Sequence, residues 1–257
     1  MLPYTRILAR QYTAEIILLH VVNPVYTVPA TAFSGPVFFQ VPESVFKEKA
    51  EDLEKFGVDE LRDLPVRRLV YEGAPESQIA EFVQGEGVQL VVMPTHGHGA
   101  FRRYLLGSVS AKVLHDVGCP VLTDAHIGTP PSAVDPKFAK IVCALDLGER
   151  SRNTLDYALK LATDFQASLS LVHVVSRHEQ QSLPRTQLEE LQKQSGAEAA
   201  GLHIEEGDVA HQVSSFVQSA GADLLVIGRG AHEHGSGRLR TNGYAIIRQA
   251  PCPVLSV

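Results

Sequence analysis

The sequence has no tryptophan, only three cysteines, and no apolar stretch near the roughly 20 residues that a membrane-spanning helix needs. The lack of long apolar runs excludes a helical membrane protein, so no membrane partner is expected. The first twelve residues, MLPYTRILARQY, have no basic segment leading into a long apolar run and no small-residue cleavage site. The sequence therefore predicts a cytoplasmic protein.

Positive charge is also scarce, with 23 Lys and Arg against 29 Asp and Glu and a net charge of −6. Without a basic field to attract a phosphate backbone, nucleic acid is not expected as a partner. Cys119, Cys143 and Cys252 are odd in number and form no closely spaced pair of metal-ligand type. We interpret them as buried structural thiols, in preference to disulfide or zinc-binding cysteines.

Catalytic motifs are missing as well. The chain contains no GxxxxGK[ST] loop, no GxSxG elbow and no HExxH helix. Adjacent acidic residues such as Glu189 and Glu190 are more typical of a solvated helix face than of an acid–base pair. The sequence therefore does not indicate a dedicated enzyme.

What the sequence does contain is an internal repeat. Four strings recur in the same order: LLHVV as LVHVV, EGAPESQIAEFVQ as EGDVAHQVSSFVQ, QLVVMPTHGHG as DLLVIGRGAHE, and GCPVL as PCPVL. His173 lies 153 residues after His20, whereas Glu206 lies 134 residues after Glu72. The repeat indicates a duplication, with a longer insertion after Pro24 in the first copy. That insertion is either a partner-contacting arm or a simple surface loop.

Each copy alternates short apolar runs with helical periodicity. In the second copy the runs KIVCALD, SLSLVHVV, LHIEE, DLLVIG and CPVLSV are separated by helices expected near 150–165, 184–200, 208–220 and 241–249. Strands that are apolar at nearly every position are buried on both faces, as in a parallel sheet covered by helices. The pattern predicts an α/β, doubly wound fold that binds ligands at the carboxyl ends of its strands.

The division between the copies is expected in a segment rich in Pro, Gly and Ser, Ile127–Pro136. We therefore expect one domain over residues 1–126 and a second over residues 137–257. Below, these are called the first half and the second half.

A glycine-bearing loop follows the strand QLVVM of the first half. It runs from Pro94 through Gly97 to Gly107, after which Ser108 opens a helix. Glycines let backbone amides approach an anion closely, and a helix N-terminus offers free amides and a positive dipole end. The loop is therefore suited to a phosphate group. The alternative is a turn that merely connects strand to helix.

The spacing in this loop resembles that of the universal stress protein family, in which Gly, two residues, Gly and nine residues precede Gly-Ser or Gly-Thr. Gly97 and Gly107 are separated by nine residues and Ser108 follows, while Pro94 replaces the first glycine. The resemblance continues through HVV, the EG turn and CPVL, twice over and across almost the whole chain. It implies a tandem member with two Rossmann-like domains of the adenine nucleotide alpha hydrolase type.

By analogy with ATP-binding members, the resemblance implies ATP as the cofactor, with or without Mg²⁺. The implied phosphate-binding residues are Gly97, Gly107, Ser108 and Val109. The implied residues of the adenine and ribose pocket are Val21 and Met93, next to Pro94, which removes one amide donor from the loop. Any hydrolysis is expected to be slow, in a site that binds rather than catalyses.

The first half departs from the family at its beginning. In the second half a first strand and turn, KIVCALDLGERS, ends near Asp146, which matches the family's acidic residue at the nucleotide pocket. Only 19 residues precede His20, and they resemble the end of a helix followed by the second strand. We therefore expect that the first strand is missing. Our hypothesis is that Met1 is an internal start and that an upstream segment resembling KILVPVD belongs to the natural protein.

The second half departs from the family pattern in the loop that corresponds to the phosphate loop of the first half. It keeps Asp146 and Gly228, but Arg240 stands where Gly107 stands in the first half. Its side chain would either fill the phosphate position or contact an anion itself, and we favour a degenerate, structural second site. The Gly-x-Gly at 228–230 lacks the third glycine of a dinucleotide fingerprint, which makes NAD binding improbable.

Paired histidines in the two loops, His96 with His98 and His232 with His234, are too few for a structural zinc site, and no metal is expected. Two functions remain open. One is a stress-response protein in which ATP changes the surface offered to an unknown protein partner. The other is an interaction scaffold without nucleotide, in which the CPVL strands pair between copies or chains. Both a homodimer and an intramolecular pair of the halves are compatible with the sequence.

Overall fold

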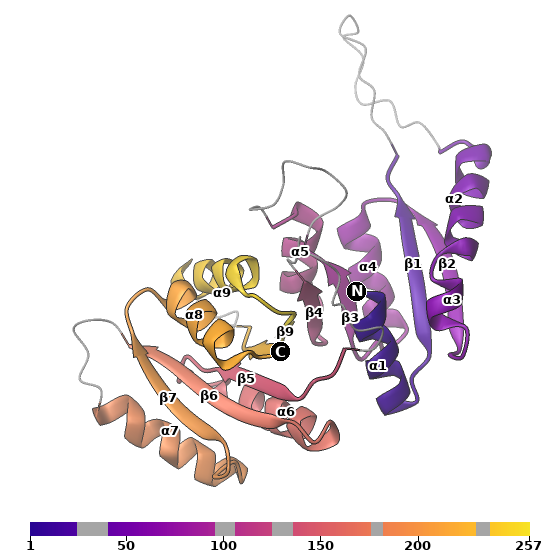
Figure 1. Ribbon diagram of the computed structural model, residues 1–257. Coiled ribbons are helices and arrows are strands. Elements are labelled where there is room, and N and C mark those ends of the chain that lie inside the picture. The colour runs from indigo at the N-terminus through magenta and orange to yellow at the C-terminus, as the bar shows by residue number, and fades with distance from the viewer. Residues whose placement is uncertain (25–40, 96–105, 125–135, 176–181, 230–236) are drawn as a thin grey trace, which may run out of the picture.

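The computed structural model describes residues 1–24, 41–95, 106–124, 136–175, 182–229 and 237–257. The second half holds a parallel five-stranded sheet with helices on both faces, in the order β7-β6-β5-β8-β9 (Figure 1). Its strands are β5 (Lys140–Ala144), β6 (Ser168–Val175), β7 (Gly201–Glu206), β8 (Leu224–Ile227) and β9 (Val254–Ser256). Its helices are α6 (Ser151–Asp164), α7 (Ser182–Ser195), α8 (Val209–Ala220) and α9 (Gly237–Gln249).

The first half repeats this plan with one strand fewer. Its described strands are β1 (Ile16–Val22), β2 (Val66–Glu72), β3 (Val91–Pro94) and β4 (Val121–Asp124). Its described helices are α1 (Leu2–Tyr12), α2 (Glu43–Lys55), α3 (Val58–Leu61), α4 (Pro75–Gly85) and α5 (Ser108–Asp116). By position in the repeat, β1 and β2 correspond to β6 and β7, and β3 and β4 correspond to β8 and β9. Among the described residues nothing corresponds to β5.

The missing strand divides the first half's sheet. β1 pairs with β2 in a two-stranded parallel sheet of its own, whereas β3 pairs with β4. In the second half β5 lies between β6 and β8 and pairs with both. Figure 1 shows the consequence: β1 and β2 stand apart from the rest of the strands.

The two halves are joined into one sheet by their last strands. β4 pairs antiparallel with β9, with Leu122 opposite Leu255, which extends the second half's sheet to seven strands. This is the pairing between the two CPVL segments that the scaffold hypothesis considers. Alternation of side chains along each strand then gives two core layers, because Val121 faces one side of the sheet and Leu122 the other.

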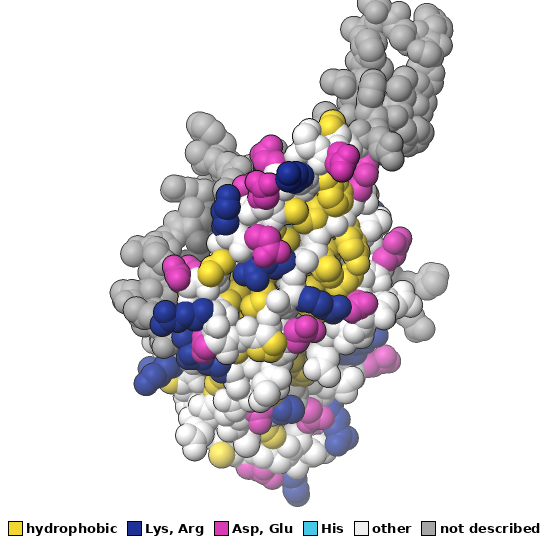
Figure 2. All heavy atoms as spheres, turned by 90° about the vertical axis from the view of Figure 1, so that its right-hand side faces the viewer, with side chains coloured by type: hydrophobic (Ala, Val, Ile, Leu, Met, Phe, Trp, Pro, Cys, Tyr) yellow, Lys and Arg dark blue, Asp and Glu magenta, His cyan; other side chains and the backbone are white. Residues whose placement is uncertain are grey.

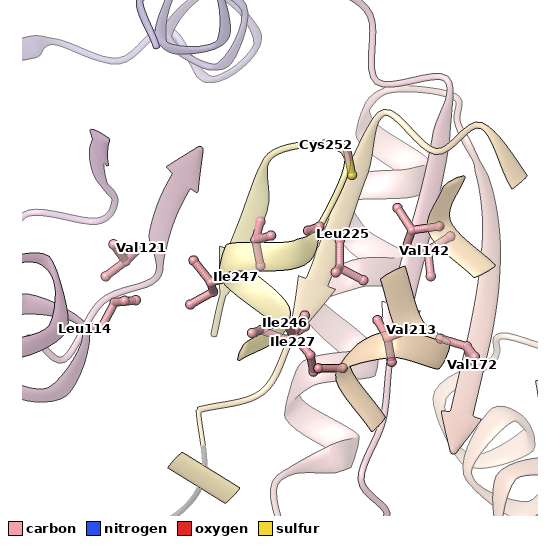
Figure 3. Packing of buried hydrophobic residues seen from close by; sticks show 14 of the residues in the cluster. Leu114, Val121, Val142, Val172, Val213, Leu225, Ile227, Ile246, Ile247 and Cys252 are labelled. Carbon is pink, nitrogen blue, oxygen red and sulfur yellow. The ribbon is translucent and has the colours of Figure 1, made fainter. Parts of the chain in front are cut away.

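Both core layers are shared by the halves. On one face, Leu114 of α5 and Val121 of β4 belong to the same buried cluster as Ile246 and Ile247 of α9 (Figure 3). On the other face, α1 of the first half packs against the second half, where Tyr4 stacks on Phe138 with ring centroids 5.9 Å apart. The halves therefore form one continuous hydrophobic core.

The expected helices of the second half are found, with two differences at their ends. The second helix ends at Ser195 rather than near residue 200, because Gly196 takes a left-handed φ of 69° and residues 197–200 form a turn, with the amide of Ala200 bonded to the carbonyl of Ala197. The last helix begins at Gly237 rather than near residue 241. Most of the insertion after Pro24 and of the segment at 127–136 lies outside the described residues. Within the described part, no helix combines the length and apolar character required to cross a membrane.

Candidate functional site

The candidate phosphate site of the first half lies where α5 begins, beyond the carboxyl end of β3. Gly107 is the N-cap residue of α5, with φ −61° and ψ 147°, and has no side chain that could cap the helix. Its amide donates to the carbonyl of Thr95 at 2.8 Å. Within the described residues, the amides of Ser108 and Val109 donate to no acceptor. One amide of the expected phosphate loop is therefore capped internally, and two remain open.

The strand end is tied to the same helix. The hydroxyl of Ser110 donates to the carbonyl of Pro94 at 3.1 Å, so the first turn of α5 is fixed against the end of β3. Pro94 itself is exposed, and Met93 is partly buried against the core. The structure thus brings together Met93, Pro94, Gly107, Ser108 and Val109.

Two expected residues of this site are not placed beside that group. Val21 lies near the end of β1, in the separate two-stranded sheet, and no described strand links β1 to β3. Gly97 lies outside the described residues, as do His96 and His98. A pocket for adenine and ribose between Val21 and Met93 therefore stays a prediction.

The corresponding site of the second half has a different content. Asp146 follows β5, and its Oδ1 accepts from the amide of Gly148 at 2.9 Å and from the hydroxyl of Ser151 at 2.8 Å. The carboxylate thereby holds the turn that leads into α6. At the end of β8, a Cβ on Gly228 would lie 2.8 Å from Oγ1 of Thr154, so only glycine allows this close approach to α6.

Arg229 is a feature of this region that sequence reasoning missed. Its guanidinium reaches across to the first half and donates to the carbonyls of Leu114 at 3.2 Å, Val117 at 2.8 Å and Cys119 at 2.7 Å. These carbonyls belong to the end of α5 and the turn that follows it, where the helix dipole favours a cation. Burial lowers the pKa of Arg229. The only signal in the sequence was a charged residue two positions after the end of a fully apolar strand.

Arg229 therefore links the regions of the two candidate sites through its hydrogen bonds to the end of α5. It adjoins Gly228 in the second half, and it holds the carboxyl end of the helix whose amino end is Ser108. Its counterpart in the first half is Thr95, which is buried and whose hydroxyl donates to the carbonyl of Asp124 at 3.3 Å. The side chain of Arg240 lies outside the described part, so its expected place at the phosphate position is untested.

The three cysteines are free thiols. Cys143 and Cys252 are buried, and burial raises the pKa of Cys252 to about 12 and that of Cys143 further. Cys119 is partly exposed and burial raises its pKa as well. Their environments agree with structural thiols. In the part of the chain that the structure describes, no group of three or more His, Cys, Asp or Glu is arranged to hold a metal.

Comparison with known proteins explains the repeat. The model of the universal stress protein family matches the chain twice, over residues 4–123 and 137–257. The chain belongs to the universal stress protein family. It is a tandem member with two domains, as the resemblance in the sequence implies.

Relatives cover either one domain or both. A universal stress protein from Thermus aquaticus is 32% identical over 117 residues, which is 44% of this chain and 80% of that protein. A universal stress protein from Mycobacterium bovis is 28% identical over 225 residues, covering 80% of this chain and 73% of its own. The solved structure of a universal stress protein from Archaeoglobus fulgidus matches with a TM-score of 0.73 and 22% identity, over 99% of this chain and 89% of that one. This likeness confirms the α/β fold.

Proposed function

We propose that this universal stress protein binds ATP in its first half, with the phosphate groups at the N-terminus of α5, and that nucleotide occupancy changes its interaction with a protein partner. The observation that carries the proposal is the pair of amides at Ser108 and Val109, which have no acceptor among the described residues. They follow Gly107, whose missing side chain leaves room for an anion at the helix end.

The electrostatics of this position favour a phosphate. The amino end of an α-helix carries roughly half a positive elementary charge, which stabilises an anion within the first turn. The carboxyl end of α5 carries the opposite partial charge, and Arg229 covers it with three hydrogen bonds. Pro94 contributes no amide, so the anion would depend on Ser108 and Val109 more strongly than in a loop with a glycine there.

The second candidate function is a scaffold without nucleotide. It is favoured by the split sheet of the first half, because no described strand pairs with both β1 and β3 in the way that β5 pairs with β6 and β8. It is also favoured by the joined halves, since β4 and β9 already pair within the chain. On this reading the uncapped amides are solvated and the protein acts through its surfaces alone.

Binding of ATP by calorimetry separates the two functions. Gly107 has an extended backbone conformation that any residue adopts, so Gly107→Arg is expected to fold while placing a long side chain at the phosphate position. We expect measurable ATP binding by the wild type and a loss of at least about tenfold in affinity in this variant, which corresponds to about 1.4 kcal/mol. Titrations with and without Mg²⁺ show whether the cation takes part.

The matched control is Gly85→Arg. It makes the same change in charge and size at the end of α4, where a Cβ would meet nothing within 4 Å. Its ATP affinity should equal that of the wild type. A wild-type protein whose melting temperature ignores millimolar ATP, and which releases no nucleotide on denaturation, would favour the scaffold.

A further inference from the structure

The helix that carries the candidate phosphate site, α5, is held by two side chains of the second half. Arg229 donates three hydrogen bonds to carbonyls at the carboxyl end of this helix and just beyond it. The hydroxyl of Tyr244, on α9, donates to the carbonyl of Ala111 at 3.2 Å. Ala111 lies only three residues after Ser108, so the second half contacts α5 near both of its ends.

The repeat places different side chains at the equivalent positions of the first half. Tyr244 lies 133 residues after Ala111, which is also the offset between the two CPVL segments. The counterpart of Tyr244 is therefore Ala111 itself, which has no polar side-chain atom. The counterpart of Arg229 is Thr95, whose hydroxyl donates to the end of β4 in its own half. The two side chains that hold α5 are therefore specific to the second half.

The helices of the first half differ in how far they are covered. α5 buries Ser110, Val113 and Leu114, and the last two belong to the core cluster that both halves share. Among the described residues of α2 none is buried. Figure 2 shows hydrophobic side chains at the surface between charged ones, on the side of the molecule that carries α2 and β2 in Figure 1. α5 therefore lies within the contact between the halves, whereas α2 lies at the surface.

A short helix transmits a constraint from one end to the other. α5 has nine residues, and at 1.5 Å per residue it is about 14 Å long. Ser110 fixes its amino end to the carbonyl of Pro94, and Arg229 fixes its carboxyl end, where the helix dipole favours a cation. Because the turns of a helix are joined by hydrogen bonds, movement at the carboxyl end displaces the first turn, which carries the amides of Ser108 and Val109.

We infer that the second half positions the first turn of α5 through Arg229, with Tyr244 as a second contact, and thereby sets how tightly the first half binds an anion there. The inference rests on the proposed function for the identity of that anion, ATP. The halves then have unequal roles, since the first holds the ligand and the second keeps the helix in place. Arg229 is a positioning residue, because it acts through α5 from the far end of the helix.

Hydrogen exchange without nucleotide tests the positioning itself. The amide of Ala111 donates to the carbonyl of Gly107 at 2.9 Å and reports on the first turn of α5. The amide of Gln78 donates to the carbonyl of Ala74 at 3.0 Å and reports on the first turn of α4. In Arg229→Ala we expect the ratio of the Ala111 rate to the Gln78 rate to rise at least about fivefold. A general loss of stability accelerates both amides and leaves this ratio unchanged.

Calorimetric titration with ATP tests the consequence for the ligand. Arg229→Ala should bind ATP at least about fivefold more weakly than the wild type, which is the lower end of the usual coupling between two sites. Arg229→Lys should recover part of the affinity, because it keeps a cation at the end of α5. Tyr244→Phe loses one hydrogen bond and should bind about twofold more weakly.

The matched control is Leu171→Ala, which lowers stability from the opposite core layer. Leu171 is fully buried on β6, on the other face of the sheet from the buried residues of α5. This variant should change neither the exchange ratio nor the affinity for ATP.

Three outcomes overturn the inference. Arg229→Ala could leave the exchange ratio unchanged, it could leave the affinity of an ATP-binding wild type unchanged, or Leu171→Ala could have the same effects as Arg229→Ala. A wild type that binds no ATP would refute the proposed function alone, because the exchange ratio still decides whether the second half positions α5.

Discussion

The two halves of this protein share one repeat but differ in one central strand, and the difference shows what that strand does. In the second half β5 pairs on both sides, and Leu171 on the adjacent β6 is completely buried. In the first half the corresponding position, Leu18 on β1, remains partly exposed. The neighbours of a central strand thus depend on it for burial as well as for hydrogen bonds.

The halves also differ at the residues for which the family resemblance implies a role in ligand binding. The first half keeps Gly107 and the open amides of Ser108 and Val109, whereas the second half keeps Asp146. In the second half the carboxylate of Asp146 is engaged by the turn before α6. The open amides and the acidic residue that the family resemblance implies are therefore described in different halves.

The largest expected effect on stability comes from replacing the corresponding leucine of each half, Leu171 or Leu18, by alanine. Leu171→Ala should lower the free energy of unfolding by about 2–5 kcal/mol, since a fully buried leucine leaves a cavity. Leu18→Ala should cost only about 1–2 kcal/mol, because part of that side chain is already in contact with water. Urea unfolding followed by circular dichroism measures both values.

Each of the two variants serves as the control for the other, because Leu171 and Leu18 have the same position in the repeat and receive the same substitution. Equal costs in the two halves would mean that the first half is as well packed as the second in solution, which would contradict the comparison.

A smaller loss of stability is expected when the hydrogen bonds of Arg229, which connect the two halves, are removed. Arg229→Ala leaves the carbonyls of Leu114, Val117 and Cys119 without their shared donor, which should cost about 2–3 kcal/mol. Arg229→Lys should recover part of this loss, because an ammonium group can reach fewer of the three acceptors. The measurement is again the free energy of unfolding in urea.

The control for that prediction is Arg152→Ala. Arg152 is exposed on α6 and its only described ion pair is with Asp156 at 3.7 Å, one turn along the helix. Removing it should change stability by less than about 0.5 kcal/mol. If Arg229→Ala were as mild as this control, the connection across the halves would be energetically unimportant.

Much of this architecture is predictable from the sequence, because it depends on local patterns and on the repeat. Runs such as LLVI in β8 are apolar at every position, which predicts a parallel strand covered on both faces.

The features that escaped prediction depend on contacts between distant segments. Nothing near Arg229 in the sequence identifies Cys119 as its partner, 110 residues away. The end of α7 at Ser195 is a local exception, because Gly196 takes a left-handed φ of 69° and the amide of Ala197 bonds to the carbonyl of Gln192 at 2.8 Å. At the candidate site, the hydrogen bond from the Gly107 amide to Thr95 depends on the path of a loop, which spacing alone does not specify.

The smallest expected effect comes from exchanging the caps of two corresponding helices. Asp208 caps α8, and its Oδ1 accepts from the amide of His211 at 2.9 Å. Its counterpart before α4 is Ala74, which has nearly the same backbone angles, φ −74° and ψ 118° against φ −71° and ψ 124°, but no capping side chain. Asp208→Ala should cost about 1 kcal/mol, the usual value for losing an N-cap.

The reverse change, Ala74→Asp, should stabilise the first half, because its backbone already has the conformation that a capping aspartate needs. The gain should be about 0.5 kcal/mol and thus smaller than the loss at Asp208, since the amide of Ser77 already bonds to the carbonyl of Ala74 at 3.1 Å. Thermal unfolding of both variants and of the double variant measures the two effects, which should add because the helices lie in different halves. Destabilisation by Ala74→Asp would show that the two helix starts differ in more than the residue at the cap.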